Sequence, residues 1–214
     1  MIAAIFSGGS YRDLEFYRGL IKDAGLIIAA DSGGEALLLL GVVPDILVGD
    51  MDSIGAGVFT EIGGRGAQVI EVPPEKDFTD TELAVRTALD RGAEEIVICG
   101  ALGGRLDHTL ANISLLVLAQ ERGVTARIVT EDQEAYLLAA DVVNPIEGAI
   151  GKTVSLIALS DPTTGVTTHD LKYPLREASL TLLSPLGVSN EISGPNPYVE
   201  FREGRLLLVA VRNP

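Results

Sequence analysis

The first 130 residues alternate short, fully apolar runs with longer stretches in which apolar residues recur at helical spacing. Apolar runs such as Ile2–Phe6 and Ile96–Cys99 predict strands that are buried on both faces. Amphipathic stretches such as 79–91, with Leu83 and Leu89 along one side, predict helices between them. The predicted strands are 2–6, 26–30, 46–48, 68–72, 96–99 and 127–130, and the predicted helices are 11–24, 34–40, 79–91 and 109–122. This alternation predicts an α/β fold, with a Rossmann-like, mostly parallel sheet flanked by helices.

After about residue 131 the helix-length pattern ends and short alternating runs replace it. Alternation of apolar and polar residues is typical of half-buried strands. Such runs cover 135–138, 153–159, 165–171, 180–183 and 198–211. The last run predicts a hairpin that turns at Glu203 and Gly204. We therefore expect two domains, an α/β domain over 1–130 and a C-terminal all-β sandwich over 131–214.

The charge of the chain is strongly negative and unevenly distributed. Its 214 residues include 30 acidic and 16 basic residues, and the net charge is -14. Such a charge disfavours nucleic acid and anionic membranes as partners, because basic surfaces bind both. Between Asp31 and Asp80 ten acidic residues stand against two basic ones, so this segment alone carries -8. The segment is either a solvated acidic surface or a site for a cation.

Composition excludes several other classes of site. The single cysteine, Cys99, rules out an internal disulfide and a zinc site built from several cysteines. It lies in the apolar run 96–99, where cysteine usually acts as a small hydrophobic residue. The first residues lack a signal peptide's basic and apolar segments, and no apolar run approaches the ~20 residues needed to span a bilayer. We therefore expect a cytoplasmic protein without a membrane segment.

Potential ligand groups follow four of the predicted strands at their carboxyl ends. The segments are Asp31–Gly33, Gly49–Ser53, Lys76–Asp80 and Gly103–His108. In an open α/β sheet, ligands bind beyond this edge of the strands. Each segment alone has an ordinary explanation, such as a turn at Asp31 or a helix cap at Asp77 or Thr79. His108 alone would be explained as a structural or surface residue. Their occurrence at four successive strand ends favours a binding site.

The residue types predict the chemistry of that site. Asp50 and Asp52 are two apart at a strand end, where carboxylates repel each other unless a cation joins them. Carboxylate oxygens without thiol partners suit Mg²⁺, and Lys76 and Arg105 are placed to neutralise phosphoryl charge. A Walker-type phosphate loop is absent, and the turn 7–10 is better explained as a plain turn than as a phosphate contact. The residues thus indicate a Mg²⁺-dependent enzyme acting on a nucleotide or phosphate ester.

Taken together, these segments resemble the thiamine pyrophosphokinase (thiamine diphosphokinase) family. The matching motifs in the first half are ADSG at 30–33, VGDMDS at 48–53, KDFTDTE at 76–82 and GGRLDH at 103–108. Those in the second half are GVTT at 165–168, LKYPL at 171–175 and GVSNE at 187–191. The ordered set is highly specific, and the resemblance extends from about residue 2 to the end of the chain.

The resemblance implies that the domain over 1–130 binds nucleotide and metal and carries catalysis, and that the sandwich over 131–214 binds thiamine. It implies transfer of the diphosphate group of ATP to the hydroxyl of thiamine, which gives thiamine diphosphate and AMP. It also implies a homodimer with active sites shared between the two chains.

The resemblance further implies a role for each matching residue. The implied Mg²⁺ ligands and catalytic residues are Asp50, Asp52 and Asp80. Either Asp52 or Asp80 is a candidate to accept the hydroxyl proton of thiamine. The implied nucleotide-binding residues are Asp31, Lys76, Asp77, Thr79, Arg105, Asp107 and His108. The implied thiamine contacts are Ser189 and Asn190.

The chain departs from the family pattern in two places. The chain has no Trp, although some members of the family stack an aromatic ring on the substrate. Tyr173 is a candidate for that platform, and a core position is the alternative for it. His169 and Asp170 stand where a glycine-containing pair is expected.

Two alternative functions are open at this point. One is a related pyrophosphokinase acting on another hydroxymethyl heterocycle, such as a pterin precursor. The other is a non-catalytic protein that binds thiamine or a nucleotide.

Overall fold

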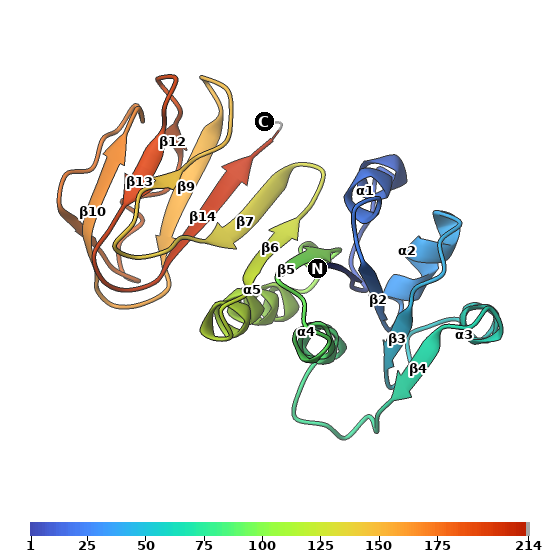
Figure 1. Ribbon diagram of the computed structural model, residues 1–214. Coiled ribbons are helices and arrows are strands. Elements are labelled where there is room, and N and C mark those ends of the chain that lie inside the picture. Colours follow the sequence, from blue (N-terminus) through green and yellow to red (C-terminus); the bar gives the residue numbers. More distant parts are fainter. Residues whose placement is uncertain (213–214) are drawn as a thin grey trace. The chain divides into compact units, whose positions relative to one another are not determined.

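The computed structural model describes residues 1–212, and the chain divides into two compact units (Figure 1). Unit 1 spans Met1–Glu131, and unit 2 begins at Asp132. Unit 1 combines strands and helices, whereas the described part of unit 2 consists of strands and their connections. Within residues 1–212, no helix combines the length and the apolar character needed to cross a membrane.

Unit 1 is built on one parallel sheet. Its strands are β1 (Ile2–Phe6), β2 (Leu26–Ala30), β3 (Ile46–Gly49), β4 (Gln68–Glu71), β5 (Glu95–Cys99) and β6 (Thr125–Val129). Their order is β6-β5-β1-β2-β3-β4, and every neighbouring pair is parallel. The chain adds β2 to β4 on one side of β1 and then returns to place β5 on the other side. The strand order therefore reverses between β1 and β5, where doubly wound folds bind their ligands.

Five helices cover this sheet. They are α1 (Leu14–Ile21), α2 (Gly33–Leu39), α3 (Ala56–Gly64), α4 (Asp80–Asp90) and α5 (Leu106–Glu121). Figure 1 shows α1, α2 and α3 on one face of the sheet and α4 and α5 on the other. Because both faces are covered, the strand residues Ala3–Phe6 and Ile96–Cys99 are almost completely buried. The predicted α/β fold with a parallel sheet is confirmed.

The helix α3 was not predicted from the sequence. It contains three glycines, and Ile62 is its single buried side chain, so its amphipathic signal is weak. Its position depends on contacts with α2. The Glu35 carboxylate accepts a hydrogen bond from the N–H of Gly55 at the start of α3, and Ile62 packs directly against Gly34.

Unit 2 is a sandwich of two antiparallel sheets. Its strands are β7 (Gln133–Leu137), β8 (Asn144–Pro145), β9 (Thr153–Ala158), β10 (Thr163–His169), β11 (Ala178–Leu180), β12 (Asn190–Glu191), β13 (Tyr198–Glu200) and β14 (Leu206–Val211). Within this unit one sheet has the order β12-β9-β14-β7 and the other the order β11-β10-β13-β8. Residues such as Leu156 and Leu208 from the first sheet share a core with Val166 and Val199 from the second. The predicted β-sandwich is confirmed.

The predicted hairpin over 198–211 is wrong. Strand β13 pairs with β10 and β8, whereas β14 pairs with β7 and β9, so the two strands belong to different sheets. The turn at Gly204 does exist and has a φ of +105°, but it carries the chain from one sheet to the other. Val199 and Leu208 are buried in the same core from opposite sides, which is why the sequence pattern resembles that of paired strands.

Candidate functional site

Unit 1 contains a cavity of about 560 Å³ at the carboxyl ends of its strands. It lies where the strand order reverses between β1 and β5. The lining residues include Ser7–Ser10 after β1, Asp31 and Ser32 after β2, Asp50 and Ser53 after β3, Lys76, Thr79 and Asp80 after β4, and Gly103, Gly104, Arg105 and His108 after β5. The four segments expected from the sequence thus contribute to one cavity.

Three carboxylates meet in this region. Asp31, Asp50 and Asp52 each offer an oxygen atom, and these atoms lie within 4.8 Å of one another. Met51 has a φ of +63°, and the turn there shortens the separation that Asp50 and Asp52 would have in a straight strand. Residue 49 favours glycine, because its φ is +144° and a Cβ there would lie close to the side chains of both Asp80 and Asp31, at 3.1 Å and 3.2 Å.

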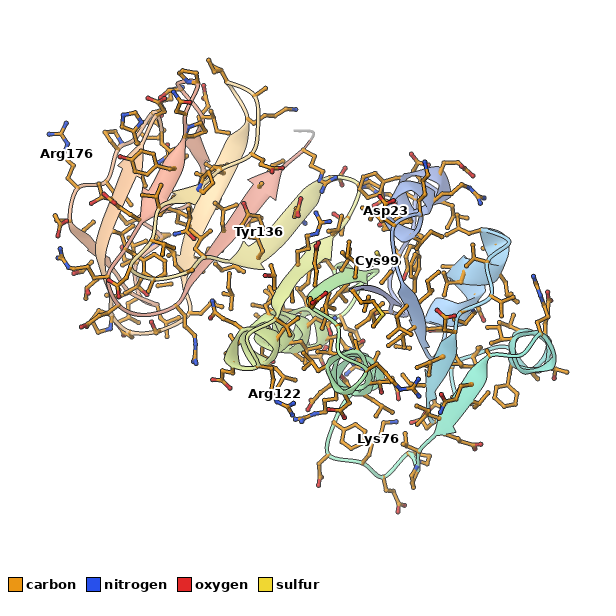
Figure 2. All side chains as sticks on the ribbon, viewed as in Figure 1. Asp23, Lys76, Cys99, Arg122, Tyr136 and Arg176 are labelled. Carbon is orange, nitrogen blue, oxygen red and sulfur yellow. The ribbon has the colours of Figure 1, made fainter. Side chains whose placement is uncertain are left out.

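Lys76 joins two of the acidic residues. Its Nζ atom lies 2.8 Å from Oδ2 of Asp50 and 2.9 Å from Oδ1 of Asp80. Figure 2 labels Lys76 on the connection between β4 and α4. The bond from Lys76 lowers the pKa of Asp50. Burial acts to lower the pKa of Lys76, but its bonds to Asp50 and Asp80 outweigh burial and raise that pKa. The ammonium group is therefore a fixed positive charge among the carboxylates.

Asp31 is the least satisfied of these acidic residues. It is buried, and its Oδ1 atom has no hydrogen-bond partner within residues 1–212. Burial and the nearby charge of Asp80 raise its pKa. An unpartnered carboxylate oxygen beside further carboxylates is the environment that a hard divalent cation relieves. The donor set of carboxylate oxygens therefore fits Mg²⁺.

The closest group of carboxylates differs from the predicted metal ligands by one residue. The sequence placed Asp80 with Asp50 and Asp52, and placed Asp31 with the nucleotide. In the structure Asp31 joins Asp50 and Asp52, while one oxygen of Asp80 contacts Lys76. Asp80 still lies beside Asp31, because both approach the same face of Gly49. That Asp80 holds the metal stays a prediction.

Two further predicted residues of the 76–80 segment, Thr79 and Asp77, lie in different environments. Thr79 caps helix α4, since its Oγ1 atom accepts a hydrogen bond from the N–H of Glu82 at 3.1 Å. It also lines the cavity. Asp77 is exposed and is not among the described residues that line the cavity. The capping explanation is thus confirmed for Thr79, and a contact of Asp77 with nucleotide stays a prediction.

The 103–108 segment places Arg105 at the N-terminus of helix α5. Gly103 and Gly104 both have a φ of +88°, which favours glycine. Arg105 bonds Asp107 through Nη2 to Oδ2 at 2.6 Å and through Nε to Oδ1 at 3.1 Å, and both side chains are exposed. This contact lowers the pKa of Asp107 to about 2. Arg105 and His108 line the cavity, whereas Asp107 holds Arg105 from outside it.

In unit 2, the predicted thiamine contacts lie beside an exposed aromatic ring. Ser189 is exposed, with a φ of +60°. Asn190 is buried, and its side chain accepts a hydrogen bond from the N–H of Tyr173 and donates one to the Tyr173 carbonyl. Tyr173 is 61% exposed, so the alternative of a core position is wrong. A direct contact of Asn190 with thiamine stays a prediction, because its amide is engaged within the unit.

Both halves of the chain match models of one protein family. Residues 17–128 match the model described as thiamin pyrophosphokinase, catalytic domain. Residues 142–206 match the model described as thiamin pyrophosphokinase, vitamin B1 binding domain. The chain belongs to the thiamin pyrophosphokinase family.

Individual thiamin pyrophosphokinases resemble this chain over nearly its full length. The chain is 29% identical over 205 residues to the thiamine pyrophosphokinase of Bacillus subtilis, with 96% of each chain covered. The crystal structure of a B. subtilis thiamine pyrophosphokinase superposes with a TM-score of 0.88 at 29% identity, over 100% of both chains. A thiamin pyrophosphokinase structure from Geobacillus thermodenitrificans gives a TM-score of 0.85 at 30% identity, over 100% of this chain and 98% of the other.

Several cavity residues of this thiamin pyrophosphokinase family member were missed from the sequence. The turn Ser7–Ser10 lines the cavity, although the sequence favoured a plain turn there. Thr81 donates a hydrogen bond to Oγ of Ser7, and the buried Asn112 donates one to the carbonyl of Ala101. The signal for Asn112 was a polar residue on the buried side of α5. The signal for the turn was its place directly after the first strand.

Cys99 takes no part in this chemistry. It ends β5, is buried, and is labelled in Figure 2. Burial raises the pKa of its thiol to about 12, so the thiol stays protonated near neutral pH. The expectation that it acts as a small hydrophobic residue agrees with this environment.

Proposed function

We propose that this protein is a thiamine diphosphokinase, which transfers the diphosphate group of ATP to the hydroxyl of thiamine and releases AMP. The observation that carries the proposal is the cavity at the strand-order reversal in a chain of this family, which Asp31, Asp50 and Lys76 line. Asp52 is not a lining residue, but its carboxylate lies beside those of Asp31 and Asp50. Unit 1 would bind nucleotide and metal and carry catalysis, and unit 2 would bind thiamine.

The carboxylates and the basic residues of the cavity divide the work. Asp31, Asp50, Asp52 and Asp80 would hold Mg²⁺, which when bound supplies positive charge to the phosphates of ATP. Lys76 and Arg105 would neutralise the charge that develops on the transferred group. Thr79 and His108, which line the cavity, would contact the nucleotide. Asp77 and Asp107, which are not lining residues, would contact the nucleotide from the edge of the cavity.

The thiamine hydroxyl would attack the β-phosphorus in line, and AMP would leave as the bond to the α-phosphate oxygen breaks. A hydroxyl is a poor nucleophile at neutral pH, so this chemistry depends mainly on positioning and charge neutralisation. Asp52 or Asp80 would accept the hydroxyl proton. Ser189 and the exposed ring of Tyr173 would contact thiamine, with Asn190 holding Tyr173 in place.

We also propose that the protein is a homodimer with shared active sites. Leu182, Leu183 and Leu186 are largely exposed, Leu183 by 91%. Exposed apolar residues close together in the chain are a feature of surfaces that a second molecule covers, which supports the proposal. Sedimentation at micromolar concentration should give a dimer, and a monomer at all concentrations would contradict this part of the proposal. The cytoplasmic location and the absence of nucleic-acid or membrane partners stay predictions.

One assay separates the proposed reaction from its alternatives. The full chain is incubated with Mg²⁺, ATP and either thiamine or a hydroxymethyl pterin, and the products are followed by ³¹P NMR and chromatography. We expect AMP and thiamine diphosphate in equal amounts with thiamine and no AMP with the pterin. AMP with the pterin alone would favour the related pyrophosphokinase. Thiamine binding without AMP formation would favour a non-catalytic protein.

A further inference from the structure

The hydroxyl of Tyr11 connects the two strands between which the strand order reverses. It donates a hydrogen bond to the carbonyl of Ser7 at 2.6 Å, and the carbonyl of Cys99 lies 3.2 Å away as a second acceptor. Ser7 directly follows β1, and Cys99 is the last residue of β5. The N–H of Ser7 also donates to the Cys99 carbonyl at 2.9 Å. The phenol therefore fastens together the ends of the two strands that flank the cavity.

The glycines beside these strand ends leave room for the hydroxyl. A Cβ at Gly100 would lie 2.2 Å from the Tyr11 oxygen, and Gly100 has a φ of +65°. A Cβ at Gly9 would lie 2.0 Å from the Gly100 carbonyl oxygen. The turn after β1 and the turn after β5 are thus in direct contact, with the phenol filling the space that a side chain at residue 100 would need.

The ring of Tyr11 is held from the other side by an aromatic cluster. It stacks on Phe6 with a centroid distance of 5.7 Å and meets Tyr17 edge-on at 4.9 Å. Burial raises the pKa of Tyr11 well above its usual value, so the hydroxyl keeps the proton that it donates. The hydroxyl is therefore a fixed donor whose position is set by packing in the core.

The segment that Tyr11 fastens has unused hydrogen-bond donors on the cavity wall. Gly8, Gly9 and Ser10 line the cavity, and within residues 1–212 none of their backbone N–H groups donates a hydrogen bond. Successive backbone N–H groups in a turn form sites for anions such as phosphate. The two carbonyls that Tyr11 engages would otherwise present partial negative charge at the same edge of the sheet.

We propose that Tyr11 is a positioning residue for ATP, which holds the Ser7–Ser10 turn against Gly100 so that the turn can bind a phosphate group. The inference rests on the proposed function, since it assigns part of the nucleotide site to a residue outside the cavity lining. Tyr11 acts through the turn and does not touch the substrate itself.

The test is Tyr11→Phe, which keeps the stacked ring and removes only the hydroxyl. We expect KM for ATP to rise about tenfold, the usual effect of losing one such hydrogen bond, while KM for thiamine and kcat change less than about threefold. Tyr17→Phe is the matched control, because it deletes a hydroxyl from the same aromatic cluster without touching either turn. Its KM for ATP should equal that of the wild type. Gly9→Ala, which separates the two turns, should raise KM for ATP as well.

Three results would overturn the inference. They are an unchanged KM for ATP in Tyr11→Phe, an equal rise in Tyr17→Phe, and a parallel rise of both KM values, which would indicate general loosening of the unit. If the wild-type chain forms no AMP, the proposed function fails by itself. Calorimetric titration of the wild type and of Tyr11→Phe with a non-hydrolysable ATP analogue then decides the role of Tyr11. Binding about tenfold weaker in Tyr11→Phe would support the inference, and equal binding would overturn it.

Discussion

The Nζ atom of Lys76 lies 2.8 Å from Oδ2 of Asp50, and the two side chains are only 8% and 11% exposed. The same ammonium group reaches Asp80 at 2.9 Å. This pairing balances part of the negative charge that the fold collects at one edge of the sheet. Charged groups so well shielded from water are expensive to leave without a partner.

Lys76→Met should therefore destabilise the chain in a pH-dependent way. The pKa of Asp50 is lowered in the folded state, so its stabilising effect is present above the unfolded value of about 4 and is lost as the pH falls through the folded pKa. The pKa of Lys76 is raised, so its contribution is present below about 10.4 and is lost as the pH rises through the folded pKa. At pH 7 we expect the free energy of unfolding, measured in urea, to be about 1–2 kcal/mol lower in Lys76→Met than in the wild type.

The same urea titrations at lower pH check the sign. The gap between Lys76→Met and the wild type should narrow as the pH falls from about 4 through the lowered folded pKa of Asp50, because only below that pKa is Asp50 protonated in both proteins. Lys22→Met, which removes an exposed lysine at the end of α1, should have no such effect. A gap of the same size throughout the acid range would show that the ion pair is not its source.

Asp52→Asn should abolish turnover and leave the fold intact. Asp52 is exposed and belongs to the group of three carboxylates that fits a cation, so its charge serves the metal more than the packing. We expect kcat to fall at least about 100-fold with an unchanged melting temperature. Glu61→Gln, on the exposed side of α3, is the control and should keep full activity. Near-normal turnover in Asp52→Asn would exclude Asp52 from the metal site.

Asn190→Ala should weaken thiamine binding through Tyr173. The variant loses the hydrogen bonds to the N–H and the carbonyl of Tyr173, at 3.0 and 2.7 Å. We expect KM for thiamine to rise about tenfold while KM for ATP stays constant. Asn144→Ala is the matched control, because Asn144 makes similar paired bonds to the backbone of Ala139. It should lower stability by a comparable amount, and a matching rise in its KM for thiamine would refute the specific role of Asn190.

Tyr173→Ala should raise KM for thiamine about tenfold with little change in melting temperature, since Tyr173 is 61% exposed. Tyr173→Trp and Tyr173→Phe keep an aromatic face and should retain most of the affinity. Steady-state kinetics with varied thiamine at saturating ATP provide the measurement. Equal KM values in the alanine and wild-type proteins would mean that another residue forms the platform for thiamine.

The sequence alone determined the class of each unit and the edge of the sheet that carries the chemistry. Continuous apolar strands such as Ile2–Phe6 are buried on both faces, and their spacing by helices requires a parallel sheet. The carboxyl ends of parallel strands meet at one edge, so the acidic residues after β2, β3 and β4 had to come close together. Membership of the thiamin pyrophosphokinase family likewise followed from the sequence. Each motif is short, but the motifs occur in a specific order and at specific spacings.

Which side chains meet depends on contacts between elements that are far apart in the sequence. Asp31 joins Asp50 and Asp52, Lys76 spans Asp50 and Asp80, and the Tyr11 hydroxyl reaches the carbonyl of Cys99, 88 residues further along the chain. The separation of β13 and β14 into different sheets and the exposure of Tyr173 were also decided by the tertiary structure. The physical reason is that periodicity along the chain reports which face of an element is buried. The distance between atoms on different strands depends instead on register, turn conformation and packing, which are set by non-local contacts.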